Sequence, residues 1–353
     1  MLTSGELVDQ GDLDELVRHV DRLCATRDWD ALVDLRDRSR RALERGRQLW
    51  PVASLAEYRL ALLAPGAWSG PMVVEGAGWL AVGPLAEVAA STHPWDELGA
   101  HVPDGPLRAV AAHERVIRGD DLDGDRSIDR RVLDIPLSLA SWEPAYALAT
   151  YRDDKAEFPA PRWPGPGDFT EVDLPSPPAP LVRDEAVEHL RSVTSVWATA
   201  SNGVSRQVAV AGDAVGAVAA LLEGAGTVRL APLDGPDALA WLGWAGPAGR
   251  RGPPPGAARG GRRWWLLHGL AGWTTDWPVP ADELGAVVDE LRWYAWDDGP
   301  RRPVGRCAWP SRTRPRAWPG PCPPTTWRLT PHPGLHPARP GGLDAGRTAR
   351  QGR

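Results

Sequence analysis

Amphipathic stripes joined by short breaks fill the first half of the chain and constrain its fold most strongly. In "GDLDELVRHVDRLCATRD" the apolar residues from Leu13 to Cys24 fall on one helical stripe, behind a capping-box-like start at Asp12. Further helices are expected in "DWDALVDLRDRSRRALERG" with Asp28 as N-cap, in "ASLAEYRLALLAPG" with Ser54 as N-cap, and in "DGPLRAVAAHERVIRG". Because closely linked helices stack in antiparallel pairs, residues 1–157 are predicted to form a helical array, either a bundle or α-solenoid-like.

A proline-dense stretch, "FPAPRWPGPGDFTEVDLPSPPAP" at 158–180, follows the array. Proline interrupts helices and central strands, so this stretch is predicted to be an interdomain linker. Beyond it, "SRQVAVAGDAVGAVAALLEG" and "GTVRLAPLDGPDALAWLGWAG" each run from a strand-like to a helix-like pattern. The order predicts a small parallel α/β domain over 181–299, with a low-complexity insert at 246–263. The fold class is therefore mainly α, with a small α/β domain behind the array.

Residues 300–353 differ in composition from everything before them. They hold eleven arginines and one acidic residue, Asp344. The whole chain has 40 basic and 46 acidic residues, so residues 1–299 carry an excess of sixteen acids. An acidic body disfavours polyanion binding, and nucleic acid is expected as a partner only through the tail, if at all.

Three interpretations of this tail stay open. Its tryptophans and arginines would suit a disordered nucleic-acid-binding arm, and its prolines would suit a ligand for an aromatic groove. The third is a shifted reading frame, because a GC-rich gene read out of register yields mainly Arg, Pro, Gly, Ala and Trp. We favour the third, and residues 300–353 are predicted to be a disordered basic tail.

The remaining composition indicates source and compartment. One Lys, one Asn, three Ile and two Phe in 353 residues indicate a very GC-rich genome. Neither a signal peptide nor an apolar run of about 18 residues is evident, so we expect a cytoplasmic protein without a membrane span. Three cysteines without a CxxC pair offer no disulfide framework.

Three histidines, His93, His101 and His113, lie close together in the sequence but do not match a metal motif. "HERVI" begins like a zinc-protease helix, yet the second ligand position, four residues after His113, is Ile117. We therefore interpret the three as surface or capping residues.

The acidic stretch "DDLDGDRSID" resembles a calcium loop, since four aspartates occupy ligand positions of an EF-hand-type loop. They are Asp121, Asp123, Asp125 and Asp129. The turn glycine is replaced by Arg126 and the bidentate glutamate by Val132, so a solvated acidic loop is expected instead. We predict no metal site.

The weak candidates for a ligand site are Gly212, Asp213 and Asp234, which follow the two strand-like runs. A pocket would lie beyond the strand ends there. However, only Gly212 and Gly216 stand where a dinucleotide fingerprint needs three glycines, and no GK[ST] follows. No GxSxG is present either, and Ser201 fits turn chemistry. No cofactor or catalytic residue is predicted, and the chain is interpreted as more typical of a non-enzyme.

Sixteen tryptophans precede residue 300, and most are predicted to fill space between helices. The examples expected in the core are Trp29, Trp79, Trp197 and Trp241.

Two stretches, "WDALVDLRDRSRRALERGRQLWPVASLAEYRLALLAPGAW" and "GPLAEVAASTHPWDELGAHVPDGPLRAVAAHERVIRGDDL", resemble a family of uncharacterised proteins from high-GC actinobacteria. The resemblance covers residues 1–299 and excludes the tail. It implies source and compartment, but no activity or site residues. The sequence alone thus predicts a non-catalytic cytoplasmic interaction or scaffold protein whose partner is a protein; the alternative is a ligand-binding or enzymatic α/β domain.

Overall fold

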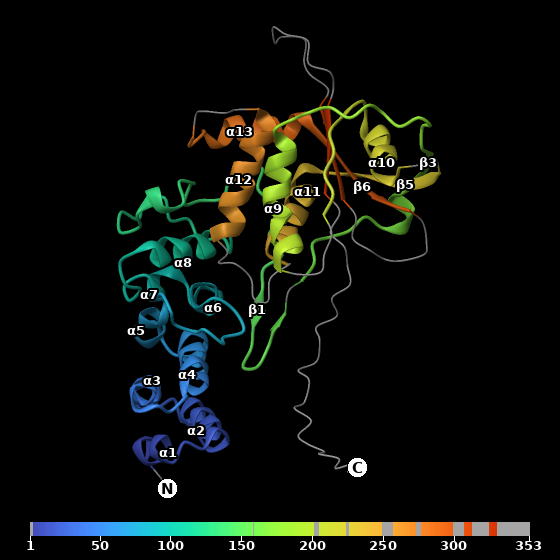
Figure 1. The fold of residues 1–353 in the computed structure, drawn as a ribbon. Helices are drawn as coiled ribbons and strands as arrows, with labels where there is room; N and C mark the ends of the chain where they lie inside the picture. Colours follow the sequence, from blue (N-terminus) through green and yellow to red (C-terminus); the bar gives the residue numbers. More distant parts are fainter. Residues whose placement is uncertain are drawn as a thin grey trace, which may run out of the picture.

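The computed structural model describes residues 3–157, 159–200, 205–223, 226–248, 257–272, 277–298, 307–312 and 325–329. The fold is mainly α, and the N-terminal helices stack one above another from α1 upward (Figure 1). The first part of the chain contains α1 (Ser4–Gln10), α2 (Leu13–Thr26), α3 (Trp29–Arg41), η1 (Ala42–Arg45), α4 (Trp50–Leu63), α5 (Gly66–Ser69), η2 (Gly70–Met72), α6 (Leu85–Thr92), α7 (Trp95–Leu98), α8 (Pro106–Val116) and η3 (Arg130–Val132).

The helix starts follow from local chemistry at most of the predicted positions. Asp12 accepts hydrogen bonds from the backbone N–H groups of the first turn of α2, and Asp28 caps α3 in the same way. The predicted N-cap Ser54 is wrong, because α4 begins at Trp50, four residues earlier. Pro51 explains the difference, since its fixed φ and missing N–H suit a first helical turn. Ser54 is therefore an interior residue of α4, and it is buried.

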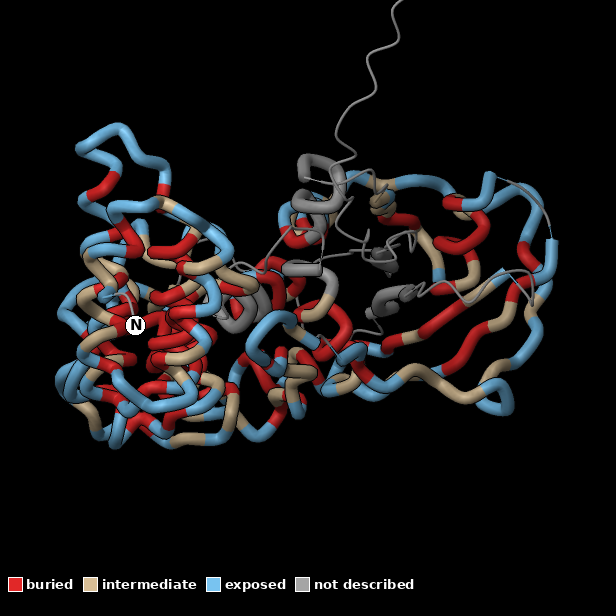
Figure 2. Tube along the Cα trace, turned by 90° about the horizontal axis from the view of Figure 1, so that it is seen from below, coloured by how far each residue is buried: buried red, intermediate tan, exposed pale blue. Residues whose placement is uncertain are grey.

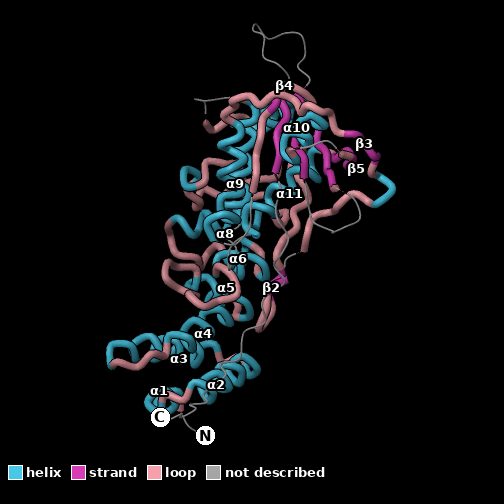
Figure 3. Tube along the Cα trace, turned by 45° about the vertical axis from the view of Figure 1, so that its right-hand side comes forward, coloured by secondary structure: helices cyan, strands magenta, loops and turns pink. Residues whose placement is uncertain are grey.

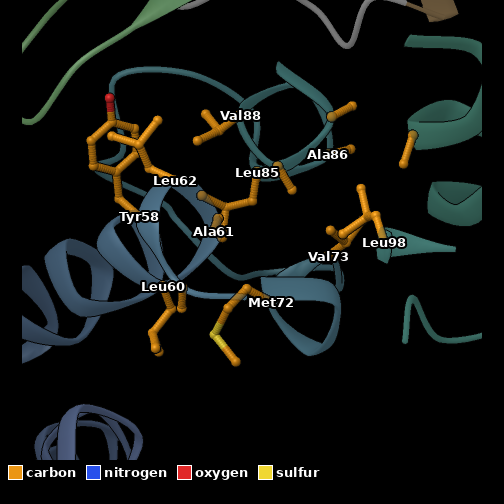
Figure 4. Close-up of a cluster of buried hydrophobic side chains, with 14 of the residues drawn as sticks. Tyr58, Leu60, Ala61, Leu62, Met72, Val73, Leu85, Ala86, Val88 and Leu98 are labelled. Carbon is orange, nitrogen blue, oxygen red and sulfur yellow. The ribbon is translucent and has the colours of Figure 1, made fainter. Parts of the chain in front are cut away.

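The array has one continuous apolar core. It runs from α1 to the strand after η3, and the side chains of α4, η2, α6 and α7 meet at its centre (Figure 4). Figure 2 shows the buried residues concentrated inside the array and, separately, inside the second part of the chain. Trp29 is buried in the first core and Trp241 in the second, as predicted. The side chain of Trp197 lies outside the described residues.

The second part combines helices with a six-stranded sheet (Figure 3). The hairpin of β1 (Thr150–Tyr151) and β2 (Ala156–Glu157) belongs to the array core. The elements of the second part are η4 (Pro166–Asp168), β3 (Thr170–Asp173), α9 (Ala186–Ala200), β4 (Val210–Ala211), α10 (Ala214–Leu222), β5 (Thr227–Leu233), α11 (Gly235–Ala248), α12 (Ala257–Ala271), α13 (Ala281–Glu290), β6 (Leu291–Asp297), β7 (Cys307–Arg312) and β8 (Thr325–Leu329). The strand order is β3-β5-β6-β7-β8-β4.

The predicted parallel arrangement is wrong. Every strand pair that the structure describes is antiparallel, and β4 and β5 lie on different sides of the sheet with β6, β7 and β8 between them. The two strand-helix units are therefore not one βαβ crossover. A strand followed by a helix fits either topology, because the sequence does not say which strands pair.

The chain passes between its two cores more than once around the predicted linker. Trp142 packs in the second core, where its indole N–H donates to the carbonyl of Ala281 at 2.6 Å. The chain then returns to the array as the β1–β2 hairpin, which lies beside α6 in Figure 1. There Tyr58 donates its hydroxyl hydrogen to the carbonyl of Arg152, and Arg59 pairs with Asp153 at 2.6 Å. The hairpin thus joins the linker to the array.

Two segments of the basic tail, β7 and β8, are strands of the sheet, and β7 pairs with β6. The rest of residues 299–353 lies outside the described residues, as do residues 249–256 of the low-complexity insert. Among the helices that the structure describes, all are too short or too polar to cross a membrane.

Candidate interaction surface

Of the three predicted ligand-site residues, Asp234 lies apart from the neighbouring Gly212 and Asp213. Asp213 is the N-cap of α10 and accepts from the N–H of Gly216 at 2.8 Å, while Asp234 accepts from the N–H of Asp237 at 2.7 Å at the start of α11. Gly212 directly precedes Asp213, and its α-carbon faces the side chain of Ala179. Because three strands separate β4 from β5, the two aspartates serve separate helix starts.

The acidic stretch and two of the histidines that resemble metal motifs take part in the packing of the array, as their hydrogen bonds and burial show. The Asp125 carboxylate accepts from the indole N–H of Trp95 at 2.7 Å, and that of Asp123 accepts from the N–H of Leu137 at 3.2 Å. His93 is the C-cap of α6 and His101 is exposed, as interpreted, but the interpretation is wrong for His113, which is buried inside α8. No group of three or more possible ligands occurs within the described ranges.

A buried ionic cluster holds the hairpin against the array. Glu87 of α6 and Glu114 of α8 are both fully buried, and Arg118 lies 4.0 Å from Glu114. Arg118 also donates to the carbonyl of Ala149, just before β1, at 3.3 Å. Burial lowers the pKa of the Arg118 guanidinium, against the opposing effect of the two carboxylates. The cluster has almost no contact with solvent, so its geometry fits a structural clamp.

Cys24, the cysteine of the array, is a poor nucleophile in this structure. Burial raises the pKa of its thiol to about 11, so the neutral thiol prevails at neutral pH. The Ser4 hydroxyl oxygen lies 3.0 Å from Nε2 of His19, but the other ring nitrogen of His19 lies 3.4 Å from the guanidinium of Arg22, where a catalytic triad has a carboxylate.

The loop between η2 and α6, residues 73–84, is held in place by hydrogen bonds to buried polar side chains of α4. The side chain of Glu57 on α4 is 98% removed from solvent, and its carboxylate accepts from the N–H of Gly78 at 2.6 Å and from the guanidinium of Arg40. Arg40 also donates to the carbonyl of Gly76 at 3.3 Å. A buried carboxylate is costly unless it is paired and hydrogen-bonded, and here one oxygen binds the loop directly while the other binds Arg40, which also reaches the loop.

A second buried side chain of α4 holds the next part of the loop. The hydroxyl oxygen of Ser54 accepts from the N–H of Leu80 at 2.8 Å. The backbone turns at Gly78, the first of the two anchored residues, with φ +67° and with its α-carbon so close to Leu85 that a β-carbon would lie 2.6 Å from the Leu85 side chain. Only glycine suits that position. Trp50, Ser54 and Glu57 lie within about 60° on α4, so Trp50 continues the stripe that faces the loop.

The anchored loop exposes its largest side chain. Trp79 is 82% exposed, and Leu80 and Val74 are exposed as well, whereas Ala77, Ala81 and Val82 pack against the core. The prediction that Trp79 fills the core is wrong. The residue follows Gly78, and the two anchored N–H groups on either side turn its ring outward. We call Val74, Trp79, Leu80 and the partly exposed Trp50 the Trp79 surface.

Sequence reasoning missed this surface for two reasons. The sequence pattern predicts Ser54 as a helix cap, although the N–H that its hydroxyl binds is that of Leu80, in a loop 26 residues further along the chain. Glu57 follows an ordinary amphipathic pattern, and nothing local marks it as buried. The one available signal was "EGAGWLAVGP", in which a tryptophan stands among glycines rather than on a helical stripe.

These features define a mainly α protein with an apolar, rigidly held loop on its helical array. The chain matches a family of unknown function, DUF6183, over residues 14–300, and it belongs to that family. The match ends at the residue where the composition changes from acidic to basic. No curated protein and no solved structure matches the chain.

Proposed function

We propose that the chain is a non-catalytic cytoplasmic interaction protein, which binds a partner protein through the Trp79 surface. The observation that carries the proposal is the combination of an 82% exposed Trp79 with two buried polar anchors, Glu57 and Ser54, dedicated to the loop that presents it. A loop held in one conformation loses little entropy on binding, so the exposed ring can contribute most of its contact energy.

The size of the expected contribution follows from the exposed area. A tryptophan side chain buries roughly 200 Å² in a contact. At about 25 cal/mol per Å², covering the exposed part of Trp79 would contribute about 4 kcal/mol before the costs of association. Tryptophan is also among the residues most enriched at the energetic centres of protein interfaces. Loss of the ring should therefore weaken a complex by at least about tenfold.

Photo-cross-linking followed by reconstitution tests the proposal. A photo-reactive phenylalanine at position 79 should give a discrete adduct with one protein in a lysate of the source organism. The purified partner should then bind the wild-type chain, and Trp79→Ala should raise the Kd at least about tenfold.

The matched control is Trp265 on α12, a tryptophan that is 47% exposed in the other part of the molecule. Cross-linking from position 265 should give a different pattern, and Trp265→Ala should leave the Kd unchanged. Equal losses of affinity for the two variants, or no loss for Trp79→Ala, would contradict the proposal.

A further inference from the structure

The six-stranded sheet has one covered edge and one open edge. Its strand order places β4 at one end and β3 at the other, where Figure 1 shows it on the outside of the sheet. The β4 edge is covered, because Ala211 donates its backbone N–H to the carbonyl of Pro180 at 2.9 Å. Val182 likewise donates to the carbonyl of Ala209 at 2.9 Å. Within the described ranges no such segment lies along the outer side of β3, so that edge is open.

The register of β3 shows which backbone groups face outward. One step beyond its last register pair with β5, the N–H of Leu174 donates to the carbonyl of Gly226 at 2.8 Å. Hydrogen-bonded pairs alternate with non-hydrogen-bonded pairs in an antiparallel ladder, so Glu171 and Asp173 turn their N–H and C=O groups away from β5. Both residues are exposed. The edge therefore offers two donors and two acceptors to an added strand.

The face of the sheet beside this edge stays negative after its own ion pair is counted. Glu171 and Asp173 lie on the same face, because side chains alternate along a strand. Arg229 lies opposite Glu171 on β5, and its guanidinium binds both oxygens of Asp297 on β6, at 2.6 and 2.8 Å. Asp173 accepts from the hydroxyl of Thr227 at 3.1 Å, a contact that brings no charge. Three carboxylates thus share one guanidinium, which one of them already engages.

The other face of β3 is apolar. Val172 packs against the cluster that includes Val218 of α10 and Val228 of β5. An added strand would therefore place alternate side chains beside carboxylates on one face and beside Val172 on the other. A second copy of β3 is a poor occupant, because its Glu171 and Asp173 would bring like charges opposite these carboxylates.

We propose that the β3 edge binds an extended segment of a partner protein, which alternates basic and apolar residues and pairs antiparallel with β3. In strand addition the main-chain hydrogen bonds supply affinity and the alternate side chains supply specificity. Acidic side chains at an edge oppose pairing between copies of the same strand, and the same charges favour a basic strand. This site is separate from the Trp79 surface, and it would be a second binding site of the molecule.

Fluorescence anisotropy with a short, capped, labelled peptide of alternating arginine and valine tests the inference on the full-length chain. The peptide should bind saturably, and added salt should weaken it. Antiparallel pairing puts the arginines opposite Glu171 and Asp173, so their N–H groups face β3. A peptide N-methylated at its arginines should therefore lose binding, whereas one N-methylated at its valines should keep it. Equal binding of the two methylated peptides would show charge attraction without strand pairing and would overturn the inference, as would the absence of saturable binding.

Variants of the chain locate the site. Glu171→Gln/Asp173→Asn should raise the Kd of the peptide about threefold to thirtyfold, since two cross-strand charge pairs are lost. The matched control is Asp289→Asn/Glu290→Gln, which removes the same two charges at exposed positions at the end of α13 and before β6, and it should leave the Kd unchanged. Equal losses for the two double variants would contradict the assignment to β3. Circular dichroism establishes that each variant is folded, and Trp79→Ala should bind the peptide like wild type, so failure here leaves the proposed function standing.

Discussion

Replacement of Glu57 by glutamine should loosen the Trp79 loop while keeping the shape of its anchor. The carboxylate of Glu57 accepts from both Gly78 and Arg40, whereas an amide has one accepting oxygen and a nitrogen that would face the Arg40 guanidinium, donor against donor. A hydrogen bond to a charged group contributes about 1.5–3 kcal/mol. The bond to Arg40 is worth less because that side chain is 43% exposed. We therefore expect a loss of about 2 kcal/mol in the free energy of unfolding.

The measurement is urea unfolding followed by far-UV circular dichroism, which reports the helical array. Glu75→Gln is the matched control, since it makes the same chemical change at an exposed glutamate of the same loop, and it should alter stability by less than about 0.5 kcal/mol. Equal stabilities of the two variants would refute the anchoring role of Glu57. Hydrogen exchange should also show faster exchange of the Gly78 and Leu80 amides in Glu57→Gln alone.

Three other outcomes follow from the structure. Asp213→Ala and Asp234→Ala should each destabilise the chain by about 1 kcal/mol through a lost helix cap, and a thermal-shift screen of nucleotides and metal ions should stabilise wild type and variants equally or not at all. The hydrogen bond from Arg115 lowers the pKa of Asp120 below its ordinary value of 3.8, so Asp120→Asn should reduce the free energy of unfolding at neutral pH. The difference from wild type should shrink below pH 3.8 and disappear once the pH has passed the lowered pKa, because Asp120 is then protonated in the folded state. Truncation after Gly299 should leave the melting temperature of the array unchanged by circular dichroism, because the core residues that the structure describes in the array, Leu7 to Tyr151, all precede the tail; a lower melting temperature would contradict this.

The helical array was predictable because its signals are local. Asp12 and Asp28 cap helices where expected, and most of the apolar stripes of α2 and α3 are buried as their spacing indicates, although Leu13 and Val17 at the start of α2 are exposed. The antiparallel sheet was not predictable, because strand pairing depends on contacts between distant segments such as β5 and β6. A strand-helix pattern is the same in either topology.

The candidate surface was missed for the same physical reason. Ser54 and Glu57 of α4 accept hydrogen bonds from the loop that packs on that helix, and Arg40 donates to the same loop from α3. Each of these polar side chains has an ordinary local explanation in the sequence, as a cap or as part of a solvated face. Only the hydrogen bonds that all three make with residues 76–80 explain why Trp79 is exposed rather than buried.

Hydrogen exchange of the bound and free chain tests the central claim most directly. With the cross-linked partner of the Trp79 surface bound, the amides of residues 73–84 and of the first turn of α4 should exchange more slowly than in the free chain. Protection confined to the sheet or to α9–α13, with residues 73–84 unchanged, would contradict the assignment of the Trp79 surface as the binding site.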